Sequence, residues 1–412
     1  MEKIIHTDIF IAGAGPAGIA AAVAAAELGM KVCVVERNSF PGGRATASAV
    51  GTICGLYLRT YDNPVFAMQG FPKKFAERLM ELNRRKPVKF SEGCWFLPFH
   101  PVDFEKVANS FLAHQNIKLL YNATVEGFES SQQLVSVIHC SSGNENLKII
   151  PQAVIDCSGD GIICKLINHE IITDKEYQAG AIVFSVKKVS VADEFQLNFS
   201  LLKKIAQQID EGKIQEFYNL LGIIPHSLAG NSVQLKMGLP WKISEENNDG
   251  IHEKATGLAS EMFSYVHSNV TGFENSELEW IAKEAGIRTG IRANGKMFLK
   301  DEDVLTCKKS DDGICNGAWP VEYWKVGNKR VEMTFFAEHD YYSIPAGCLV
   351  SPERENFFFA GKIISAGEKA IASARVIGTC FGTGYAAGVL ASFKVRQENV
   401  SDAISFIKKQ MH

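Results

Sequence analysis

Three glycines near the beginning of the chain, Gly13, Gly15 and Gly18, have the G-x-G-x-x-G spacing of a turn that can hold a dinucleotide. The apolar run 9–12 precedes them and predicts a buried parallel strand, and the alanine-rich segment 17–28 predicts a helix. In such a turn the first glycine permits the sharp bend, the second lets the backbone approach a pyrophosphate, and the third lets the helix pack on the strand. The N-terminus of the helix then faces the phosphates with its N–H groups and its dipole.

A second apolar run, 32–35, is followed by Glu36, about twenty residues after the glycines. At this position a carboxylate accepts hydrogen bonds from the ribose hydroxyls of an adenosine. Strand, turn, helix, strand and acid together predict that the chain binds an adenine dinucleotide.

A further pair of glycines, Gly42 and Gly43, comes directly after this acid, within the segment 41–46. Paired glycines suggest backbone that lies close against a planar or phosphate group, whereas an ordinary surface loop is the alternative. Because the pair follows the predicted nucleotide-binding acid, we favour the contact with the nucleotide.

Two later blocks extend this pattern. The apolar run 153–156 ends in the glycine-rich turn 158–161 and predicts another strand of the same sheet. Near the end of the chain, 356–365 predicts a buried strand, and a glycine-rich approach leads to a predicted helix from about 384 to 393. No second strand–helix–strand unit with its own glycine turn and acid follows, which argues against a dedicated nicotinamide domain.

The remaining region carries no glycine signature. Between 171 and 288, apolar runs alternate with helical stretches such as 201–221 and 252–266. We therefore expect an α/β protein: a Rossmann-like, doubly wound dinucleotide domain built from discontinuous segments, with an inserted α+β substrate or cap domain. The expected boundaries are 1–60, 100–170 and 335–412 for the first domain, and 61–99 and 171–334 for the second.

Composition limits the classes of partner. The chain has 412 residues, 46% of them hydrophobic, and a formal net charge of -3 at pH 7, which gives no electrostatic reason to expect nucleic acid or an anionic membrane. No apolar run has the length of a membrane span, and the first strand starts almost at once without a signal peptide, so we expect a cytoplasmic protein. The 10 cysteines include no C-x-x-C pair, so we expect neither a metal site nor a dithiol centre.

Taken together, these blocks resemble the FAD-dependent oxidoreductases of the glutathione-reductase-like class, and most closely the family called simply FAD-dependent oxidoreductases. The resemblance is carried by Gly13-x-Gly15-x-x-Gly18 with Glu36, Pro41-Gly42-Gly43 with Thr46, Val154 to Asp160, Arg288 with Arg292, Ala360-Gly361 with Ser365, Arg375-Val376, and Gly384 to Gly388. It implies FAD rather than NAD, because in such proteins a C-terminal strand and helix close over the flavin. Relatives commonly carry a histidine where this chain has Glu368.

The resemblance also implies which residues bind the cofactor. For the ADP and pyrophosphate half they are Gly13, Gly15, Pro16, Ala17, Gly18, Glu36, Arg37, Gly42, Gly43, Arg44, Ala45 and Thr46, with backbone atoms of Val125 at the adenine. For the ribityl and flavin half they are Ser158, Gly159, Asp160, Gly361, Lys362, Arg375, Phe381, Gly382, Thr383 and Gly384. Backbone N–H groups near 381–384 would face the pyrimidine edge, where a helix dipole stabilises the negative charge of reduced flavin. Asp160 could instead cap a helix, and Lys362 could be a solvated charge at a strand end.

Residues for the substrate are fewer. Arg288 and Arg292 could clamp a carboxylate, because guanidinium groups match that geometry, or each could form a structural ion pair. They share a helix face only if their segment is helical. His339 could act as a general base, although a lone histidine is more often structural. Cys54 could be a reactive thiol or a tether for the flavin, but nothing marks it as activated, so we expect non-covalent FAD.

The expected reaction is two-electron oxidation of a small organic substrate, with hydride transfer to flavin N5 and reoxidation by oxygen or another external acceptor. A monooxygenase, a reductase fed by free NAD(P)H and a thiazole-synthase-like enzyme are the alternatives within catalysis. A scaffold that keeps the nucleotide fold without catalysis is the alternative outside it. The expected partner is a small-molecule substrate, and assembly into a homo-oligomer is left open.

Overall fold

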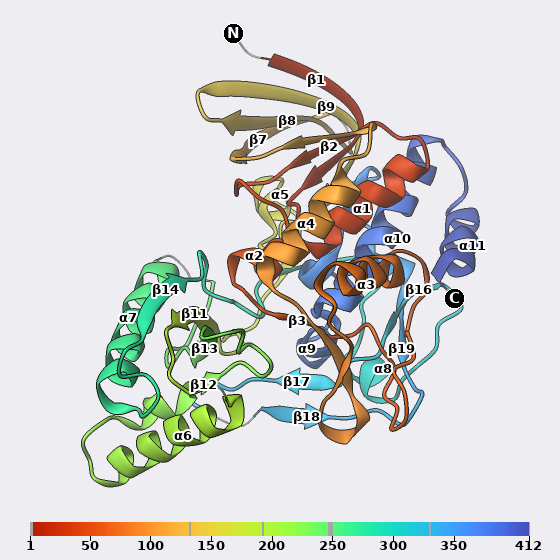
Figure 1. Ribbon diagram of the computed structural model, residues 1–412. Coiled ribbons are helices and arrows are strands. Elements are labelled where there is room, and N and C mark those ends of the chain that lie inside the picture. The colour runs from red at the N-terminus through yellow and green to blue at the C-terminus, as the bar shows by residue number, and fades with distance from the viewer. Residues whose placement is uncertain (1–2, 132, 192, 246–249, 329–330, 412) are drawn as a thin grey trace.

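The computed structural model describes residues 3–131, 133–191, 193–245, 250–328 and 331–411. Its largest sheet has seven strands in the order β6–β2–β1–β9–β8–β7, with β20 paired to β9 (Figure 1). The strands are β1 (Lys3–Ala12), β2 (Val32–Val35), β6 (Ile117–Leu120), β7 (Ala123–Ser131), β8 (Leu134–Ser142), β9 (Glu145–Asp156) and β20 (Phe357–Phe359). Strands β6, β2, β1, β9 and β20 run parallel, whereas β7, β8 and β9 form an antiparallel meander.

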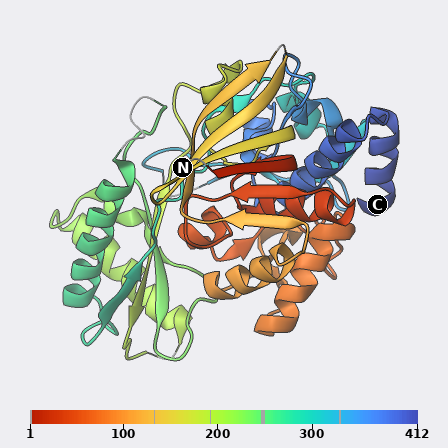
Figure 2. The same cartoon turned by 90° about the horizontal axis from the view of Figure 1, so that it is seen from above.

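The two faces of this sheet pack against different parts of the chain, because side chains alternate along a strand. In β1, Ile9 and Ile11 face a large core that contains α1 (Pro16–Glu27), α3 (Gly70–Asn83), α4 (Pro101–Leu112) and α10 (Ile377–Val395). Phe10 faces the smaller core on the meander side. Helices α1 and α10 lie side by side against the sheet (Figures 1 and 2).

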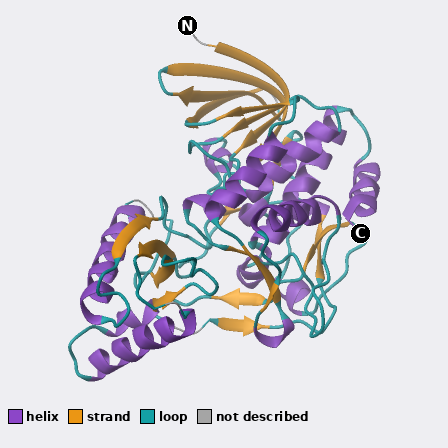
Figure 3. Ribbon diagram, in the orientation of Figure 1, coloured by secondary structure: helices purple, strands orange, loops and turns teal. Residues whose placement is uncertain are grey.

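A second unit projects from this body (Figure 3). Its antiparallel sheet has the order β12–β13–β11–β14 and is covered by α6 (Glu194–Asp210) and α7 (Ile251–Asn269). The strands are β11 (Ala181–Lys187), β12 (Leu221–Ile223), β13 (Val233–Gly238) and β14 (Glu277–Ile281). The predicted class, a Rossmann-type α/β fold with an inserted α+β unit, is confirmed by this architecture.

Short elements complete the fold. They are α2 (Arg44–Ala47), α5 (Ile162–Leu166), α8 (Asp301–Leu305), α9 (Glu368–Ala374), α11 (Val400–Met411), and 3-10 turns at Ser91–Gly93, Glu216–Leu220, Ala346–Leu349 and Gly361–Ile363. The small sheets pair β3 (Thr52–Ile53) and β4 (Val88–Lys89) with β5 (Trp95–Pro98), β10 (Ile171–Ile172) with β15 (Arg292–Ala293), β16 (Gly313–Gly317) with β19 (Tyr342–Pro345), and β17 (Val321–Tyr323) with β18 (Glu332–Thr334).

The packing differs from the expected boundaries in two respects. Residues 299–321 were expected in the second unit, but Leu299, Ile314 and Val321 pack in the large core of the first. Residues 61–99 were expected in the second unit, but their helix α3 packs in the core of the first. The ring centroids of Phe75 and Phe381 lie 4.6 Å apart, and Phe71 contacts Phe381 in the same cluster. The amphipathic pattern of α3 predicts a helix but does not say which core receives its apolar face.

Among the described residues no single helix is long and apolar enough to cross a membrane; α9 and α10 reach that length and composition only as a pair, and they are bent by 95°.

Candidate functional site

One cavity is lined both by the predicted nucleotide turn and by the second unit. It begins where β1, β2 and β9 end and extends to the sheet of the inserted unit, where Ala181, Val183 and Lys236 line it. Of the residues predicted from the sequence, Gly13, Gly15, Pro16, Ala17, Glu36, Arg37, Gly43, Arg44, Ala45, Ser158, Gly159, Arg288, Gly361, Lys362 and Arg375 line this cavity. The sequence therefore brings together segments that lie more than 300 residues apart along the chain.

Backbone atoms form the nucleotide end of the cavity. Gly15 is the N-cap of α1, no side chain caps it, and the first turn of α1 contains no acid. Gly43 has a φ of 51°, and a Cβ placed on it would lie 2.9 Å from the Gly15 Cα. The two glycine turns therefore meet with their backbones bare, and the N–H groups at the start of α1 are left for an anion. This cradle fits the diphosphate of an adenine dinucleotide.

Glu36 holds this turn in place. Its side chain is 4% exposed, and its two carboxylate oxygens accept the N–H groups of Ala14 at 2.8 Å and Asn38 at 2.9 Å. Burial raises the pKa of Glu36, although both N–H groups oppose that shift. Glu36 lines the cavity as well, so one carboxylate fixes the glycine turn and faces the nucleotide end. The contact with a ribose stays a prediction.

Asp160 lies at the centre of a charged network beside this cradle. It contacts Arg37 at 3.3 Å, Arg44 at 3.4 Å and Lys362 at 3.5 Å. Burial alone would raise the pKa of Asp160, but these cations, Lys362 foremost, lower it to about 2. Glu284 of the inserted unit contacts the same two arginines, at 2.9 Å and 2.5 Å.

Asp160 does not cap a helix, the alternative considered from the sequence. The N-cap of α5 is Gly161, and the carboxylate that accepts N–H groups of this helix is Asp156, at 2.9 Å from the nitrogen of Ile163 and 3.2 Å from that of Cys164. The side chain of Asp156 is buried beneath the turn, which leaves Asp160 for the basic network.

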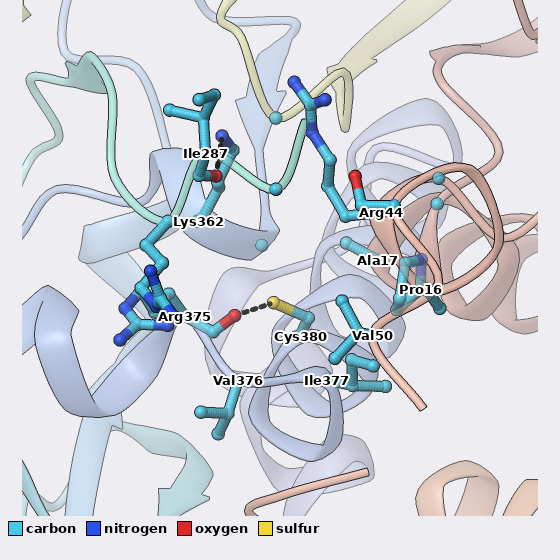
Figure 4. A pocket seen from close by; sticks show the side chains of 18 of the residues that line it. Pro16, Ala17, Arg44, Val50, Ile287, Lys362, Arg375, Val376, Ile377 and Cys380 are labelled. Atoms are coloured by element: carbon cyan, nitrogen blue, oxygen red, sulfur yellow. Dashed lines mark hydrogen bonds between the residues drawn. The ribbon is translucent and has the colours of Figure 1, made fainter. Parts of the chain in front are cut away.

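Lys362 is not a solvated strand-end charge. Figure 4 shows it beside Ile287 and Arg375 on one side of the cavity, opposite Arg44 and Ala17. Its Nζ lies 3.4 Å from the Ile287 carbonyl oxygen. Burial lowers the pKa of Lys362 to about 8, because Asp160 offsets only part of the desolvation.

The inner end of the cavity contains residues that the sequence analysis missed: Lys236, Glu322 and Trp324. The two carboxylate oxygens of Glu322 accept the indole N–H groups of Trp324 and Trp319, each at 2.7 Å. No local motif marks these positions. Lys236 belongs to β13 and Glu322 to β17, and only the fold brings these strands to one cavity.

Of the two arginines predicted to clamp a substrate, the structure brings one to the cavity. Arg288 lines it, whereas Arg292 is 1% exposed and forms two hydrogen bonds with Asp174, at 2.6 and 2.7 Å. The segment that joins them is not helical, so the spacing does not place them on one face. Arg292 therefore forms the structural ion pair that was the alternative.

His339 also lies elsewhere. Its side chain is 62% exposed, and its backbone adopts a left-handed φ of 61° while its N–H donates to the carbonyl of Arg59. It does not line the cavity. His339 lies in a surface turn before β19, and this location gives no support to a role as a catalytic base.

The helix predicted from about 384 to 393 begins earlier than expected. Helix α10 starts at Ile377 with Val376 as its N-cap, and these two residues line the cavity. Gly384, the expected start, lies in the middle of the helix. The N–H groups of 381–384 are therefore used inside α10 and do not face the cavity, because four residues of helix precede them.

Residues 381–383, predicted to face the flavin, contribute to packing instead. Phe381 is fully buried among the rings of α3 and α4, and a Cβ on Gly382 would meet Cys315. The hydroxyl of Thr383 accepts the N–H of Gly361 at 3.2 Å, which ties α10 to the turn after β20. Val376 and Ile377 take the place at the cavity that the sequence analysis assigned to 381–384.

Four further predicted residues do not line the cavity themselves: Gly18, Gly42, Thr46 and Val125. Gly18 allows close packing, since a Cβ on it would lie 1.9 Å from the Gly13 carbonyl oxygen. Gly42 and Thr46 shape the second turn, where the Thr46 hydroxyl donates to the Pro41 carbonyl at 2.8 Å. Val125 lies in β7, beyond the end of β2. Glu368, at the histidine position of relatives, accepts a hydrogen bond from the hydroxyl of Tyr323.

Comparison with known proteins agrees with this geometry. The family model described as "FAD dependent oxidoreductase" matches residues 8–410. A thiamine thiazole synthase of Aeropyrum pernix is 44% identical over 66 residues, 16% of this chain and 20% of that protein. A mitochondrial dihydrolipoyl dehydrogenase of Macaca fascicularis is 35% identical over 82 residues, 20% of this chain and 15% of that protein. The matches thus span a fifth or less of these relatives.

Solved structures show the same fold. CabE, an aromatic hydroxylase from angucycline biosynthesis, has a TM-score of 0.54 at 9% identity, over 98% of this chain and 65% of that one. The anhydrotetracycline hydroxylase OxyS from Streptomyces rimosus has a TM-score of 0.52 at 11% identity, over the same shares. The bare glycine cradle, the buried carboxylate at the end of β2 and the match over nearly the whole chain lead to one conclusion: the protein belongs to the family of FAD-dependent oxidoreductases, with FAD as its cofactor.

Proposed function

We propose that this enzyme oxidises a small organic molecule by two electrons at the inner end of the cavity. The observation that carries the proposal is the continuity of the cavity from the cradle at Gly15 to the polar wall at Lys236 and Arg288. FAD, when bound, supplies a hydride acceptor at N5 of its flavin. The chain then has to bind the dinucleotide, hold the substrate beside it and keep bulk water away.

The residues divide between these tasks along the cavity. Glu36 and the bare start of α1 serve the adenosine and diphosphate. Val50 and Ile377 provide apolar wall near the middle (Figure 4). The inserted unit covers the inner end with Ala181 and Val183, so a substrate there would be enclosed between the two units.

The N-terminus of α10 provides the electrostatic contribution of the fold. Val376 and Ile377 bring the start of a 19-residue helix to the cavity, with no acid in its first turn. Its dipole favours negative charge there, by about 0.3–1 kcal/mol at exposed sites and up to ~2 kcal/mol when partly buried. This favours a flavin that carries charge after it has accepted a hydride.

The test is the reductive half-reaction. Purified, FAD-loaded protein is mixed under anaerobic conditions with candidate amines, hydroxy acids and NAD(P)H while the visible flavin absorbance is recorded. Bleaching by an amine or a hydroxy acid, followed by recovery of the colour on admission of oxygen or an added electron acceptor, is the expected result. Loss of absorbance with none of the amines and hydroxy acids would contradict the proposal, and no loss with NAD(P)H either would leave a scaffold role in its place.

Hydroxylation is the second candidate. It is favoured by one observation, that the solved structures with TM-scores above 0.5 include two hydroxylases. A hydroxylase would bleach with NAD(P)H rather than with the organic substrate, so the same experiment separates the two reactions. Oxygen admitted afterwards would then yield a hydroxylated product only when the organic substrate is present.

A further inference from the structure

The inner end of the cavity contains more positive than negative charge. Lys236, Arg288 and Arg375 line it together, and Glu322 is the carboxylate among them. Both oxygens of Glu322 already accept indole N–H groups, and among the described residues none of the three cations forms an ion pair with a carboxylate. By contrast, Arg37 and Arg44 at the nucleotide end both contact Asp160 and Glu284.

The hydrogen bonds of these cations are incomplete. Arg288 donates to the carbonyl of Ala179, and Arg375 donates to Gln178 at 3.2 Å and to the Glu322 carbonyl at 3.1 Å. The Nε of Arg375 is buried without a partner among the described residues. Unpaired buried charge is costly, so such donors normally have an anion to bind.

Lys236 is the least satisfied of the three. Within the described part of the chain its ammonium has no hydrogen-bond acceptor, and its Nζ lies 5.0 Å from the centroid of the Trp324 ring. The guanidinium of Arg288 lies 4.4 Å from the same ring. The bond to Glu322 fixes the orientation of this indole, so Trp324 holds both cations at one place on the wall.

We infer that Lys236, Arg288 and Arg375 form the binding site of a small organic dianion of the dicarboxylate type. Three cations against one carboxylate leave an excess of two positive charges, which two carboxylates balance. Guanidinium groups bind a carboxylate through two parallel hydrogen bonds, and an ammonium adds a point charge. This inference rests on the proposed function only in placing an organic substrate at the inner end of the cavity.

The three cations are contributed by separate elements. Lys236 comes from β13, Arg288 from the segment before β15, and Arg375 from the end of α9. A dianion between them would therefore contact the inserted unit and the FAD-binding body at the same time.

Binding of malonate, a dicarboxylate, to FAD-loaded protein tests the inference without turnover. Isothermal titration calorimetry would compare malonate with malonamide, which has the same shape and no charge. We expect malonate to bind at least ~10-fold more tightly, since hydrogen bonds from charged donors to a carboxylate are stronger than those to a neutral amide. K236M and R288M should each weaken malonate binding by a similar factor, R288K should lose less than R288M, and the affinity for FAD should stay unchanged.

Lys203→Met is the matched control, because Lys203 is an exposed cation on α6 of the same unit. Three results would overturn the inference: malonate no tighter than malonamide, equal weakening by K203M, or loss of FAD affinity in K236M and R288M with malonate binding unchanged. The last result would assign the cations to the cofactor. Malonate binding that depends on Lys236, in a protein whose flavin no organic compound bleaches, would refute the proposed oxidation alone.

Discussion

Gly384 of α10 packs directly on Ala17 of α1: a Cβ placed on Gly384 would lie 2.1 Å from the Ala17 carbonyl oxygen and 2.6 Å from its Cα. Ala17 belongs to the turn of α1 that lines the cofactor cavity. The close approach of α10 therefore positions the first turn of α1. One glycine more than 360 residues away along the chain sets the geometry of the diphosphate cradle.

Gly384→Ala should consequently destabilise the protein. The added methyl group must push two backbones apart, and overpacking of this kind costs about 1–3 kcal/mol. We expect a lower urea midpoint and weaker retention of FAD, measured by denaturation and by flavin content after gel filtration.

Gly257→Ala provides the control. Gly257 lies in α7, and a Cβ there would meet no atom within 4 Å. This substitution should stabilise the protein by roughly 0.5–1 kcal/mol, because alanine has the higher helix propensity. Equal effects of the two substitutions would show that α10 and α1 are not in contact at Gly384.

The same glycine shows where sequence reasoning succeeds and where it fails. The spacing of Gly13, Gly15 and Gly18 predicts the first unit because the steric requirement at each glycine arises within the turn itself. Near Gly384 a similar density of glycines was interpreted as an approach to a helix, whereas it lies inside one. Small residues serve a turn or a helix–helix contact equally well, and the difference depends on Ala17, which no local pattern reveals.

Charged residues illustrate the same limit. Arg288 and Arg292 stand four residues apart and look equivalent in the sequence, but one lines the cavity and the other pairs with Asp174. The partner lies 118 residues away along the chain, so only the fold separates their roles. Lys236 could not be recognised from the sequence, because only the fold places it beside Trp324, together with Arg288.

Glu36→Ala should weaken FAD binding. It removes the predicted acceptor of the ribose hydroxyls and leaves the N–H groups of Ala14 and Asn38 without their carboxylate. Hydrogen bonds to a charged group contribute about 1.5–3 kcal/mol each, so the dissociation constant for FAD should rise by ~10-fold or more. Fluorescence titration of the apoprotein with FAD measures this. Glu27→Ala, an exposed acid at the end of α1, should bind FAD like the parent; unchanged affinity in the Glu36 variant would refute the ribose contact.

Asp160→Asn should remove a component of acid sensitivity. The pKa of Asp160 is lowered to about 2 from an ordinary value of 3.8, so its ionised form stabilises the fold above pH 4 and that stabilisation is lost as the pH falls toward 2. The contribution is at most about 2 kcal/mol.

Urea midpoints at pH 5 and pH 3 measure this contribution. The parent should lose more stability between the two than the Asp160 variant does. Asp210→Asn, at the exposed end of α6, should behave like the parent. Parallel losses in all three proteins would mean that the network with Lys362, Arg44 and Arg37 does not stabilise the ionised form of Asp160.

FAD should be released completely by acid precipitation. Cys54 lies near the second glycine turn along the chain and lines the cavity, but burial raises its pKa well above that of a free thiol. A protonated thiol is a poor nucleophile toward a flavin. All the yellow colour should therefore appear in the supernatant, in the parent and in Cys54→Ala alike. Colour retained in the pellet of the parent alone would identify a covalent link through Cys54.

Malonate binding should weaken as the pH rises from 7 to 8.5. Burial lowers the pKa of Lys236 to about 8, and the neighbouring Arg288 acts in the same direction, whereas Glu322 and Cys54 raise it. Lys236 therefore loses its proton within this interval, and the population of the cationic form falls roughly fourfold. The pKa of Arg288, about 9, keeps that guanidinium mostly charged up to pH 8.5.

The comparison with K236M isolates this titration. The variant lacks the ammonium at every pH, so its weaker malonate binding should change little between pH 7 and 8.5. Calorimetry at three pH values in buffers of equal ionic strength would measure both proteins, since salt screens the attraction. If the parent and K236M lose affinity in parallel, a group other than Lys236 titrates, and the ammonium does not contact the anion. If the parent alone loses affinity, the ammonium of Lys236 contacts the anion, and the fold keeps the pKa of this lysine within the pH range of the experiment.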